Sequence, residues 1–541
     1  MGLFQILSKE TQGLDIKFII IMAMIAGLTN ALLLAVINHA SEMVSNNDVN
    51  LYFLVIYAVI FALFYVSKHS SLMRSAEYTE HIIKNIRIRV TNKIRKAELE
   101  TLEKADSSKI YTALTQDTNT LSQAAMLIVN AAQSGIMVLF SLIYIFIISP
   151  PAFFVIIIMV AIAVISYLSL SGALTLEFEK SLENEGHFFS SLSSILYGFK
   201  ELKINLKKSN EVFDNHFNIL STLEEVKVSI SKKFVYAMMF SQVFLYLLLA
   251  VIIFVIPHIW DSSSDTIIKV TASLLFIIGP IESLVDILPT YGRADAAARD
   301  IQRLEENLDY TNKNMVNDNE EYVENFDKII LRDVEFDYLD NNNQKIFGIG
   351  SIDLEINKGE TIFIIGGNGS GKSTFVKLLL GLYFPTKGSI FVDDDVVDEY
   401  NYQSYRELFS TILSDFYLFD KIYGVDNIDQ KNVDNLLTQM QLRTKTKFSD
   451  NAFTNKELST GQRKRLALIN TILEDKQIYI FDEWAADQDP QFRKYFYEDI
   501  LSKFKEQGKT IIAVTHDDQY FNVADKIYKM EYGKLNEYKK N

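Results

Sequence analysis

The stretch Gly366-Gly-Asn-Gly-Ser-Gly-Lys-Ser-Thr374 decides the fold of the C-terminal part of the chain. It fits the pattern G-x-x-x-x-G-K-[ST], follows an apolar run at 361–365 and precedes a helical pattern at 375–380. Such a loop points backbone N–H groups and a helix N-terminus at a phosphate, whereas the alternative is a glycine-rich turn without a ligand. Lys372 is expected to reach the outer phosphates and Ser373 to hold Mg²⁺. The candidate nucleotide-binding residues of the loop are Gly366, Asn368, Gly369, Ser370, Gly371, Lys372, Ser373 and Thr374.

Length and composition limit the classes of protein that fit. The chain has 541 residues, too many for one ordinary domain, and a net charge of −15. Its apolar residues gather in long runs in the N-terminal half, longer than a soluble core needs. The charge and the lack of a basic stripe with interleaved aromatic residues argue against a nucleic-acid partner. The absence of Cys excludes disulfides, thiolate metal sites and any cysteine nucleophile.

Six apolar runs are long enough to cross a bilayer as helices. Lys9 and Lys17 precede the first run, but its length and the five runs that follow disfavour a cleaved signal peptide. Ser149-Pro150-Pro151 separates the third run from the fourth as a tight helix-breaking turn. The predicted spans are approximately Phe18–Ile37, Leu51–Val66, Ala124–Ile148, Ala152–Leu170, Phe234–Val255 and Ile267–Leu288.

Loop charge predicts the orientation of these spans. The two long loops, residues 67–123 and 171–233, hold ten and eight Lys or Arg residues, whereas the loops at 38–50, 149–151 and 256–266 hold none. The long loops and both termini are therefore expected on the cytoplasmic side of a bacterial inner membrane. Both loops are patterned as helices that extend into the cytoplasm; a solvated basic face near anionic lipid is the alternative reading of their charge.

The pattern changes after the last span. Residues 295–326 are polar, with several Asn and an acidic cluster, and are predicted to be a linker. From residue 327 short β-rich runs alternate with helical patterns, as in a nucleotide-binding α/β domain. The predicted fold is thus multi-domain: an all-α six-helix transmembrane domain (1–294) fused through the linker to an α/β P-loop ATPase domain (327–541).

Two strand ends supply further polar side chains. The run Ile478–Glu483 is typical of a buried strand that ends in two carboxylates, Asp482 and Glu483. In phosphate-loop enzymes such a pair assists Mg²⁺ and polarises the attacking water, the roles assigned here to Asp482 and Glu483 respectively. A second strand ends at His516, which can contact the γ-phosphate. The alternatives are a solvated acidic turn and a surface histidine.

The stretch Leu458-Ser-Thr-Gly-Gln462 lies between the phosphate loop and these strands. With it, the C-terminal domain resembles the ATPase domain of ABC transporters, whose signature loop reads Leu-Ser-Gly-Gly-Gln. The resemblance covers the motifs in their expected order, and implies ATP and Mg²⁺ as cofactors. It implies the following roles: Tyr338 stacks on adenine, Ser459, Gly461 and Gln462 form the signature, Glu483 is the catalytic base, Asp489 belongs to the D-loop Ala486–Asp489, and His516 is the switch histidine.

Three departures from the family pattern affect these expectations. Ser414 stands where the family has a Gln that senses Mg²⁺ and the γ-phosphate, so the metal contact is expected to be shorter, water-mediated or absent. Thr460 replaces a signature glycine, which is tolerated if its φ is negative. The stretch Trp484–Pro490, with the one-plus-one layout, resembles the bacterial subgroup that exports cyclic peptides and peptide siderophores.

The resemblance also implies the assembly. The chain carries one phosphate loop, one signature and six spans, and the family builds each hydrolytic site from two ATPase domains. We therefore expect a homodimer that closes on two ATP molecules and reopens after hydrolysis, with the basic cytoplasmic loops resembling the coupling helices that carry this motion. Membrane lipid would surround the spans, and a periplasmic partner is left open.

The transported molecule is the least determined feature. Glu282 and Asp286 lie four residues apart in the sixth run and are candidates for binding cationic groups, although a solvated helix end is the alternative. Export of a cyclic peptide, a microcin-type peptide or a peptide siderophore is the leading expectation. A lipid or multidrug exporter is the first alternative; a soluble ATP-driven factor and an ATP-gated channel are alternatives from other classes.

Overall fold

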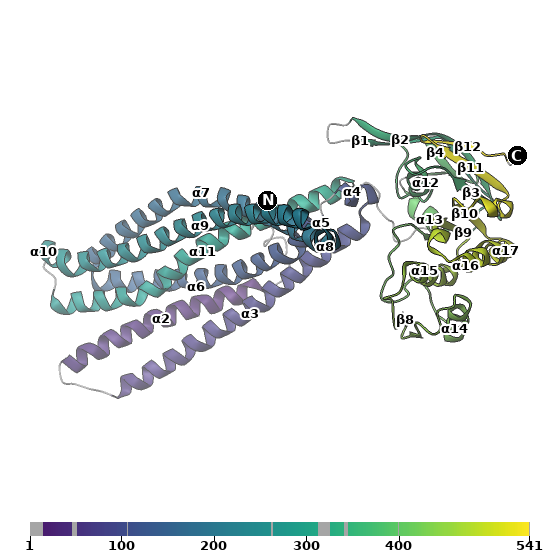
Figure 1. Ribbon diagram of the computed structural model, residues 1–541. Helices are drawn as coiled ribbons and strands as arrows, with labels where there is room; N and C mark the ends of the chain where they lie inside the picture. Colours follow the sequence, from purple (N-terminus) through teal and green to yellow (C-terminus); the bar gives the residue numbers. More distant parts are fainter. Residues whose placement is uncertain are drawn as a thin grey trace. The chain divides into compact units, whose positions relative to one another are not determined.

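The computed structural model describes residues 15–45, 51–104, 107–260, 263–311, 325–339, 344–398 and 400–539. The chain divides into two compact units: residues 1–97 with 102–310, and residues 98–101 with 311–541. In its described part the first unit is helical, whereas the second combines strands with helices (Figure 1). The predicted fold class, a helical domain joined to an α/β domain, is confirmed.

Long helices lying side by side build the first unit (Figure 1). Pro150 begins one of them at a position where its missing N–H breaks no helical hydrogen bond. The helices and two π-helical turns in this part of the chain are α2 (Ile16–Ser45), α3 (Tyr52–Lys96), α4 (Leu99–Lys104), α5 (Ser107–Thr112), η1 (Ala113–Asp117), α6 (Thr118–Ile148), α7 (Pro150–Tyr197), α8 (Phe199–Ile204), α9 (Leu206–Ala250), η2 (Val251–Val255), α10 (Ile256–Ile259) and α11 (Ser264–Thr311).

Five helical stretches among the described residues are long and apolar enough to cross a membrane, and each includes most of one predicted span. They are Lys17–Met43, Tyr52–Lys96, Lys109–Ile148, Leu206–Ile259 and Ser264–Leu284. The fourth predicted span falls on α7, whose described apolar part is Pro150–Ile162. The side chains of 163–176 lie outside the described residues. As expected, the helices α3 and α7 continue far into the long polar loops.

Close backbone approach and polar contacts hold α2, α3 and α6 together. A Cβ on Gly27 would lie 2.5 Å from Cγ2 of Ile136, so glycine allows α2 to pack tightly on α6. Ser71 of α3 donates to the carbonyl of Ile19 at 3.2 Å and accepts from Nε2 of Gln133 at 2.7 Å. Small residues and interhelical hydrogen bonds of this kind drive helix association where lipid removes the hydrophobic difference.

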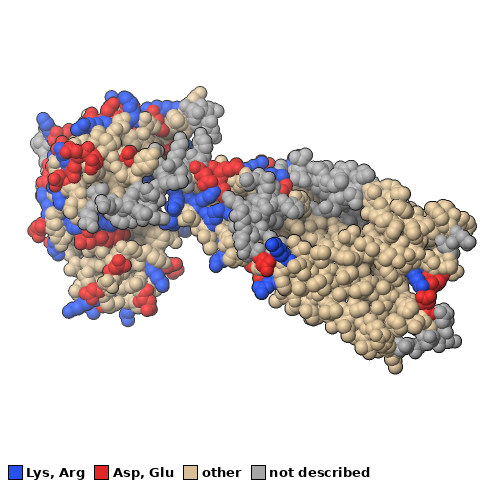
Figure 2. All heavy atoms as spheres, turned by 180° about the vertical axis from the view of Figure 1, so that it is seen from behind, with Lys and Arg blue, Asp and Glu red and all other residues tan. Residues whose placement is uncertain are grey.

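The outward faces of these helices are apolar. Leu54, Val55 and Phe61 of α3 are exposed. Figure 2 shows a broad surface of the helical unit without charged side chains. A surface this large and apolar suits contact with lipid rather than water.

The last helix extends into the segment predicted to be a linker. α11 continues to Thr311, and Ala294, Ala298 and Ile301 are buried in a cluster with side chains of α3 and α6. Packing of this apolar stripe keeps residues 295–311 helical despite their polar composition. The remaining linker residues 312–324 lie outside the described part of the chain.

Two main sheets build the second unit. A four-stranded antiparallel sheet has the order β2-β1-β4-β5, and a six-stranded sheet has the order β12-β11-β3-β10-β9-β6. In the larger sheet all strands except β12 pair in parallel. The strands are β1 (Lys328–Leu339), β2 (Lys345–Asn357), β3 (Thr361–Ile365), β4 (Lys387–Val392), β5 (Asp395–Val397), β6 (Phe409–Ile412), β9 (Ile478–Asp482), β10 (Thr510–Val514), β11 (Lys526–Glu531) and β12 (Lys534–Glu537), with a small hairpin of β7 (Phe448–Ser449) and β8 (Ala452–Phe453).

Every residue of β3, β9 and β10 is buried, because helices and the second sheet cover both faces of the large sheet. One core, which includes Phe375 and Ile362, lies toward β1 and β2; the other, which includes Phe481, lies toward the α14–α17 side. The helices are α12 (Lys372–Leu379), α13 (Tyr402–Arg406), α14 (Gln430–Gln439), α15 (Thr460–Glu474), α16 (Pro490–Tyr495) and α17 (Leu501–Glu506), with short turns η3 (Trp484–Asp487), η4 (Phe496–Ile500) and η5 (Asp518–Val523).

Candidate active site

Parallel pairing places the ends of three neighbouring strands at one edge of the large sheet. Val514 of β10 pairs with Ile364 of β3 on one side and with Asp482 of β9 on the other. The phosphate loop follows β3, Glu483 follows β9 and His516 follows β10. Loops at the carboxyl ends of parallel strands form the usual ligand crevice of such sheets.

The phosphate loop has the backbone that its glycines predict. Gly369 and Gly371 have φ of +73° and +108°, a region that residues with a Cβ rarely adopt. At Gly371 a Cβ would also lie 2.8 Å from Cγ2 of Ile349. Gly371 precedes α12, so the loop delivers its N–H groups to the start of that helix.

The interior of this loop suits a phosphate. The Lys372 side chain is buried, and its Nζ donates to the carbonyls of Gly366 at 2.9 Å and Gly367 at 3.0 Å. Buried Ser370 has a hydroxyl without a hydrogen-bond partner in the described part of the structure. An unsatisfied buried hydroxyl beside a folded-back ammonium group is explained by a site that takes an anion. Asn368, Ser373 and Thr374 lie in the same loop or its helix.

The three side chains assigned to hydrolysis lie together. Oε1 of Glu483 is 3.4 Å from Nε2 of His516 and 4.0 Å from Nζ of Lys372. The Glu483 backbone is left-handed, with φ of +50°, and its N–H donates to the carbonyl of Val514 at 3.1 Å. Such strained backbone at a strand end is typical of sites where a side chain must be aimed.

The neighbouring carboxylate fits a metal site. Asp482 is buried, which raises its pKa, although the side chain and backbone of Ser414 donate to it and Lys372 is nearby. Its Oδ1 has no hydrogen-bond partner among the described residues. A buried carboxylate oxygen without a partner suits Mg²⁺ or a water bound to it. Ser414 thus contacts Asp482 directly, a contact that its position in the sequence did not reveal.

Tyr338 lies beside the phosphate loop. Its hydroxyl is 3.4 Å from Oγ1 of Thr374 and donates to the hydroxyl of Tyr383 at 3.1 Å. Tyr383 in turn stacks on Phe336 with ring centroids 4.7 Å apart. This aromatic group holds Tyr338 at half-buried depth, where an adenine ring can stack on it.

The signature forms the start of α15. Ser459 caps this helix: its hydroxyl accepts from the N–H of Gln462, whose side chain accepts from the N–H of Ser459. Thr460 is the first helical residue, so its φ is negative and the glycine of the family pattern is not required. The helix N-terminus, with exposed Ser459, is therefore available to an anion.

The D-loop packs against the signature of the same domain and is hydrogen-bonded to it. A Cβ on Gly461 would lie 2.4 Å from the carbonyl oxygen of Asp487. The side chain of Gln488 donates to the carbonyl of Gly461 at 3.0 Å and accepts from Nε of Arg465 at 2.8 Å. Asp489 caps α16: its carboxylate accepts from the N–H of Phe492, which lowers its pKa, and from Arg465.

Lys464 contacts the site residues, although the sequence did not single it out. It is buried on α15, and its Nζ lies 2.7 Å from both the carbonyl oxygen of Glu483 and Oδ2 of Asp487. The indole of Trp484 donates to the carbonyl of Lys464 at 2.9 Å. The only signal in the sequence is the basic run 463–465 after the signature, which alone does not distinguish a buried clamp from a surface charge.

The substrate candidates lie away from these groups in sequence and on the helical unit. Glu282 is half-buried on α11, near the end of the apolar stretch Ser264–Leu284. The side chain of Asp286 lies outside the described residues. The role of both carboxylates stays a prediction.

Comparison with known proteins identifies the class. The family model described as ABC transporter transmembrane region matches residues 16–280, and the model described as ABC transporter matches residues 349–486. This chain belongs to the ABC transporter family. It is an exporter-type, multi-pass membrane protein whose ATPase activity is coupled to transport, and it binds ATP. Family members with one transmembrane and one ATPase domain per chain generally form dimers.

Individual members of the family are similar to this chain over different lengths. The ATP-binding protein SyrD of Pseudomonas syringae pv. syringae is 30% identical, over 95% of this chain and 93% of the relative. The ATP-dependent lipid A-core flippase of Saccharophagus degradans is 27% identical over 54% of this chain and 50% of its own length. A bacterial Atm1-family ABC exporter with ATP bound has the same fold, with a TM-score of 0.80 over 98% of this chain and 94% of the other, at 17% identity.

Replacing Glu483 with Gln should reduce ATP hydrolysis by about a hundredfold or more while ATP still binds, because the attacking water loses its base and the phosphate loop is unchanged. An ATP-dependent closed dimer should accumulate. Turnover and nucleotide binding are measured on the purified protein, with Glu506→Gln, an exposed carboxylate outside the site, as the matched control. Near wild-type turnover in Glu483→Gln would show that the base lies elsewhere.

Replacing Ser414 with Ala should lower turnover by less than about tenfold. The hydroxyl contributes one hydrogen bond to Asp482, near 1.4 kcal/mol at most, and the backbone bond to Asp482 remains. Steady-state ATPase rates and nucleotide affinity are the measurements. A loss of about a hundredfold at unchanged affinity would mean that the hydroxyl contacts the metal or the attacking water itself.

Replacing Gly461 with Ala should lower the ATPase rate by about tenfold or more at unchanged nucleotide affinity, because the new Cβ displaces the backbone of Asp487 and with it the D-loop. Gly186→Ala is the control, since a Cβ there has no heavy atom within 4 Å outside its own helix backbone and chain neighbours. Equal rates in both variants would show that the contact between signature and D-loop has no part in hydrolysis.

Proposed function

We propose that this chain exports a peptide-like molecule, such as a cyclic peptide, a microcin-type peptide or a peptide siderophore, across the inner membrane of a bacterium. The main support for this proposal is the stretch Trp484–Pro490. It departs from the usual family pattern and resembles the peptide-exporting subgroup. The match to SyrD over nearly the whole length supports the same one-plus-one architecture. Loop charge supports cytoplasmic positions for both termini and both long loops.

The working assembly in this proposal is a homodimer that closes on two ATP molecules. The capped N-terminus of α15 supports this, because Ser459 is exposed and offers its hydroxyl and helix N–H groups outward. In the closed state the Ser459 hydroxyl and the N–H of Gly461 would donate to the γ-phosphate held by the partner subunit's Lys372. Hydrolysis then removes the group that joins the two domains, and they separate.

The proposal gives each side chain of the site one role in ATP binding or hydrolysis. On binding, Lys372 would leave the carbonyls of Gly366 and Gly367 and pair with the outer phosphates. Glu483 would polarise the attacking water and His516 would donate to the γ-phosphate, because both already face the same point at the strand ends. Ser373 and Asp482 would hold Mg²⁺, with Ser414 acting through Asp482 or a bridging water.

A lipid or multidrug exporter is the second candidate. The partial match to a lipid A-core flippase supports it, as do the broad apolar faces of the helical unit. Glu282, with Asp286 beside it in sequence, would favour a cationic group on the transported molecule in either case. The two candidate functions therefore differ in the chemical class of the transported molecule and share the same ATPase cycle.

ATPase stimulation of the purified full-length protein in lipid separates the candidates. The panel consists of cyclic peptides, peptide siderophores, lipids and cationic drugs, and Glu483→Gln serves as the blank for hydrolysis. Peptide-like compounds should raise the wild-type rate above the lipid background. Stimulation by lipids or drugs alone would overturn the peptide proposal while leaving the ATP-driven exporter intact.

A further inference from the structure

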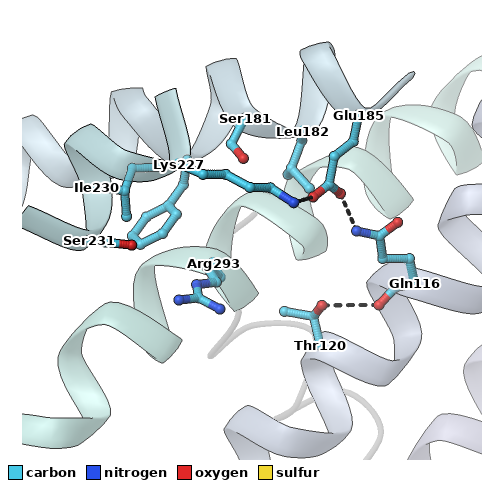
Figure 3. A pocket seen from close by; sticks show the side chains of 10 residues that line it. Gln116, Thr120, Ser181, Leu182, Glu185, Lys227, Ile230, Ser231 and Arg293 are labelled. Atoms are coloured by element: carbon cyan, nitrogen blue, oxygen red, sulfur yellow. Dashed lines mark hydrogen bonds and ion pairs between the residues drawn. The ribbon is translucent and has the colours of Figure 1, made fainter. Parts of the chain in front are cut away.

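A cavity of about 260 Å³ that is partly open to solvent lies in the helical unit, where α7, α9 and α11 meet the beginning of α6 (Figure 3). The π-helical turn η1 stands directly before α6 and brings Gln116 to the cavity wall. Such turns occur often at functional sites, because they reorient side chains within a helix. By loop charge this part of the unit is on the predicted cytoplasmic side, beyond the apolar spans.

One wall carries a satisfied ion pair. Nζ of Lys227 on α9 is 2.7 Å from Oε1 of Glu185 on α7, and the amide of Gln116 donates to the other carboxylate oxygen (Figure 3). The Glu185 carboxylate is therefore compensated in charge and in hydrogen bonding. This pair contributes no net charge to the cavity.

Arg293 of α11 is the second cation that lines the cavity, and it has no carboxylate partner among the described residues. Its guanidinium carbon lies 5.4 Å from the ring centroid of Phe178, and a Cβ on neighbouring Gly292 would meet that ring at 3.2 Å. The Phe178 ring lies within cation–π distance of the guanidinium group, and this contact leaves the N–H groups for another partner.

The neighbouring carboxylates of Asp295 and Asp117 do not balance the charge of Arg293. Asp295 is paired with Arg299 at 2.6 Å, one turn further along α11. Asp117 is buried beside Gln116 but does not line the cavity. The lining groups therefore carry two cations and one carboxylate, which favours an anion as the ligand.

The remaining wall combines three apolar side chains with the hydroxyl residues Thr120, Ser181 and Ser231. Phe178 and Ile230 are buried together, and Leu182 lines the same side. Ser181 is buried on α7 and lines the cavity, and its hydroxyl has no partner among the described residues. At 260 Å³ the cavity is smaller than the roughly 300–1,000 Å³ of sites that hold a whole drug-sized ligand. It suits the end of a longer molecule.

We propose that this cavity binds the carboxylate or phosphate group at the end of an amphipathic molecule. Arg293 holds the anion through its forked N–H groups, Ser181 donates a further hydrogen bond, and the wall of Phe178, Leu182 and Ile230 contacts the adjoining apolar part. The ligand is a free amphiphile or the headgroup of an anionic lipid, which share this chemistry. The inference concerns binding and does not rest on the proposed transport of peptides.

The test measures binding of N-dodecanoylglycine to the full-length protein in phosphatidylcholine nanodiscs without ATP, by calorimetry. Its methyl ester, which lacks the charge, is the comparison ligand. The carboxylate should bind at least about tenfold more tightly than the ester, and Arg293→Gln should remove that preference, because a charge-assisted bidentate contact is lost. Equal affinities for acid and ester, or an unchanged preference in Arg293→Gln, would overturn the proposal.

Matched variants separate binding from folding. Arg303→Gln removes an exposed arginine from the same helix and should bind as wild type. Ser181→Ala should weaken the acid severalfold, and Arg293→Lys should retain part of the preference, since it keeps the charge without the fork. Basal ATPase activity checks folding. If Arg293→Gln does not fold, wild-type affinity in both Ser181→Ala and Arg293→Lys counts against the site.

A second arm identifies the source of the ligand. The same titration in discs that contain phosphatidylglycerol should show weaker apparent binding of the acid if lipid headgroups occupy the cavity. The acid should bind unchanged if the site takes a free amphiphile. In both cases the difference must depend on Arg293; competition that persists in Arg293→Gln would refute this site. ATPase stimulation by peptides is a separate outcome, so either hypothesis can fail alone.

Discussion

Parallel pairing of β3, β10 and β9 is the constraint on which the ATPase unit depends. Because Val514 is in register with both Ile364 and Asp482, the three strands end at the same level. The phosphate loop, Glu483 and His516 come together without any further structural element, because each follows its strand directly in the sequence. Every residue of the three strands is buried, so the segments that follow them start from a closely packed sheet.

A buried lysine completes the arrangement. Glu483 adopts a left-handed backbone that costs a β-carbon-bearing residue roughly 1–2 kcal/mol. The Lys464 ammonium group contacts the Glu483 carbonyl and the Asp487 carboxylate, and the Trp484 indole returns a hydrogen bond to the Lys464 carbonyl. These bonds offset the strain and link Glu483 to the helix that begins with the signature.

Local features made much of this structure predictable. The phosphate loop, the strand-end carboxylates and the five apolar helices each depend on residues close together in sequence, so pattern and spacing sufficed. The end of α11 could not be predicted, because buried Ala298 and Ile301 keep a polar segment helical only through contacts with α3 and α6. Lys464 and Arg293 were missed for the same reason: their partners come from other elements, and their own sequence neighbours are ordinary.

The position of Trp484 also makes the site observable. The chain contains two tryptophans, and Trp484 is buried, stacks on Phe496 with centroids 4.3 Å apart, and stands next to Glu483. Indole emission depends on the polarity and stacking around the ring, so closure of the ATPase domains would alter it. With Trp260 replaced by Phe, the protein holds a single tryptophan, which stands next to Glu483 and can be excited selectively, so its cycle becomes visible without a label.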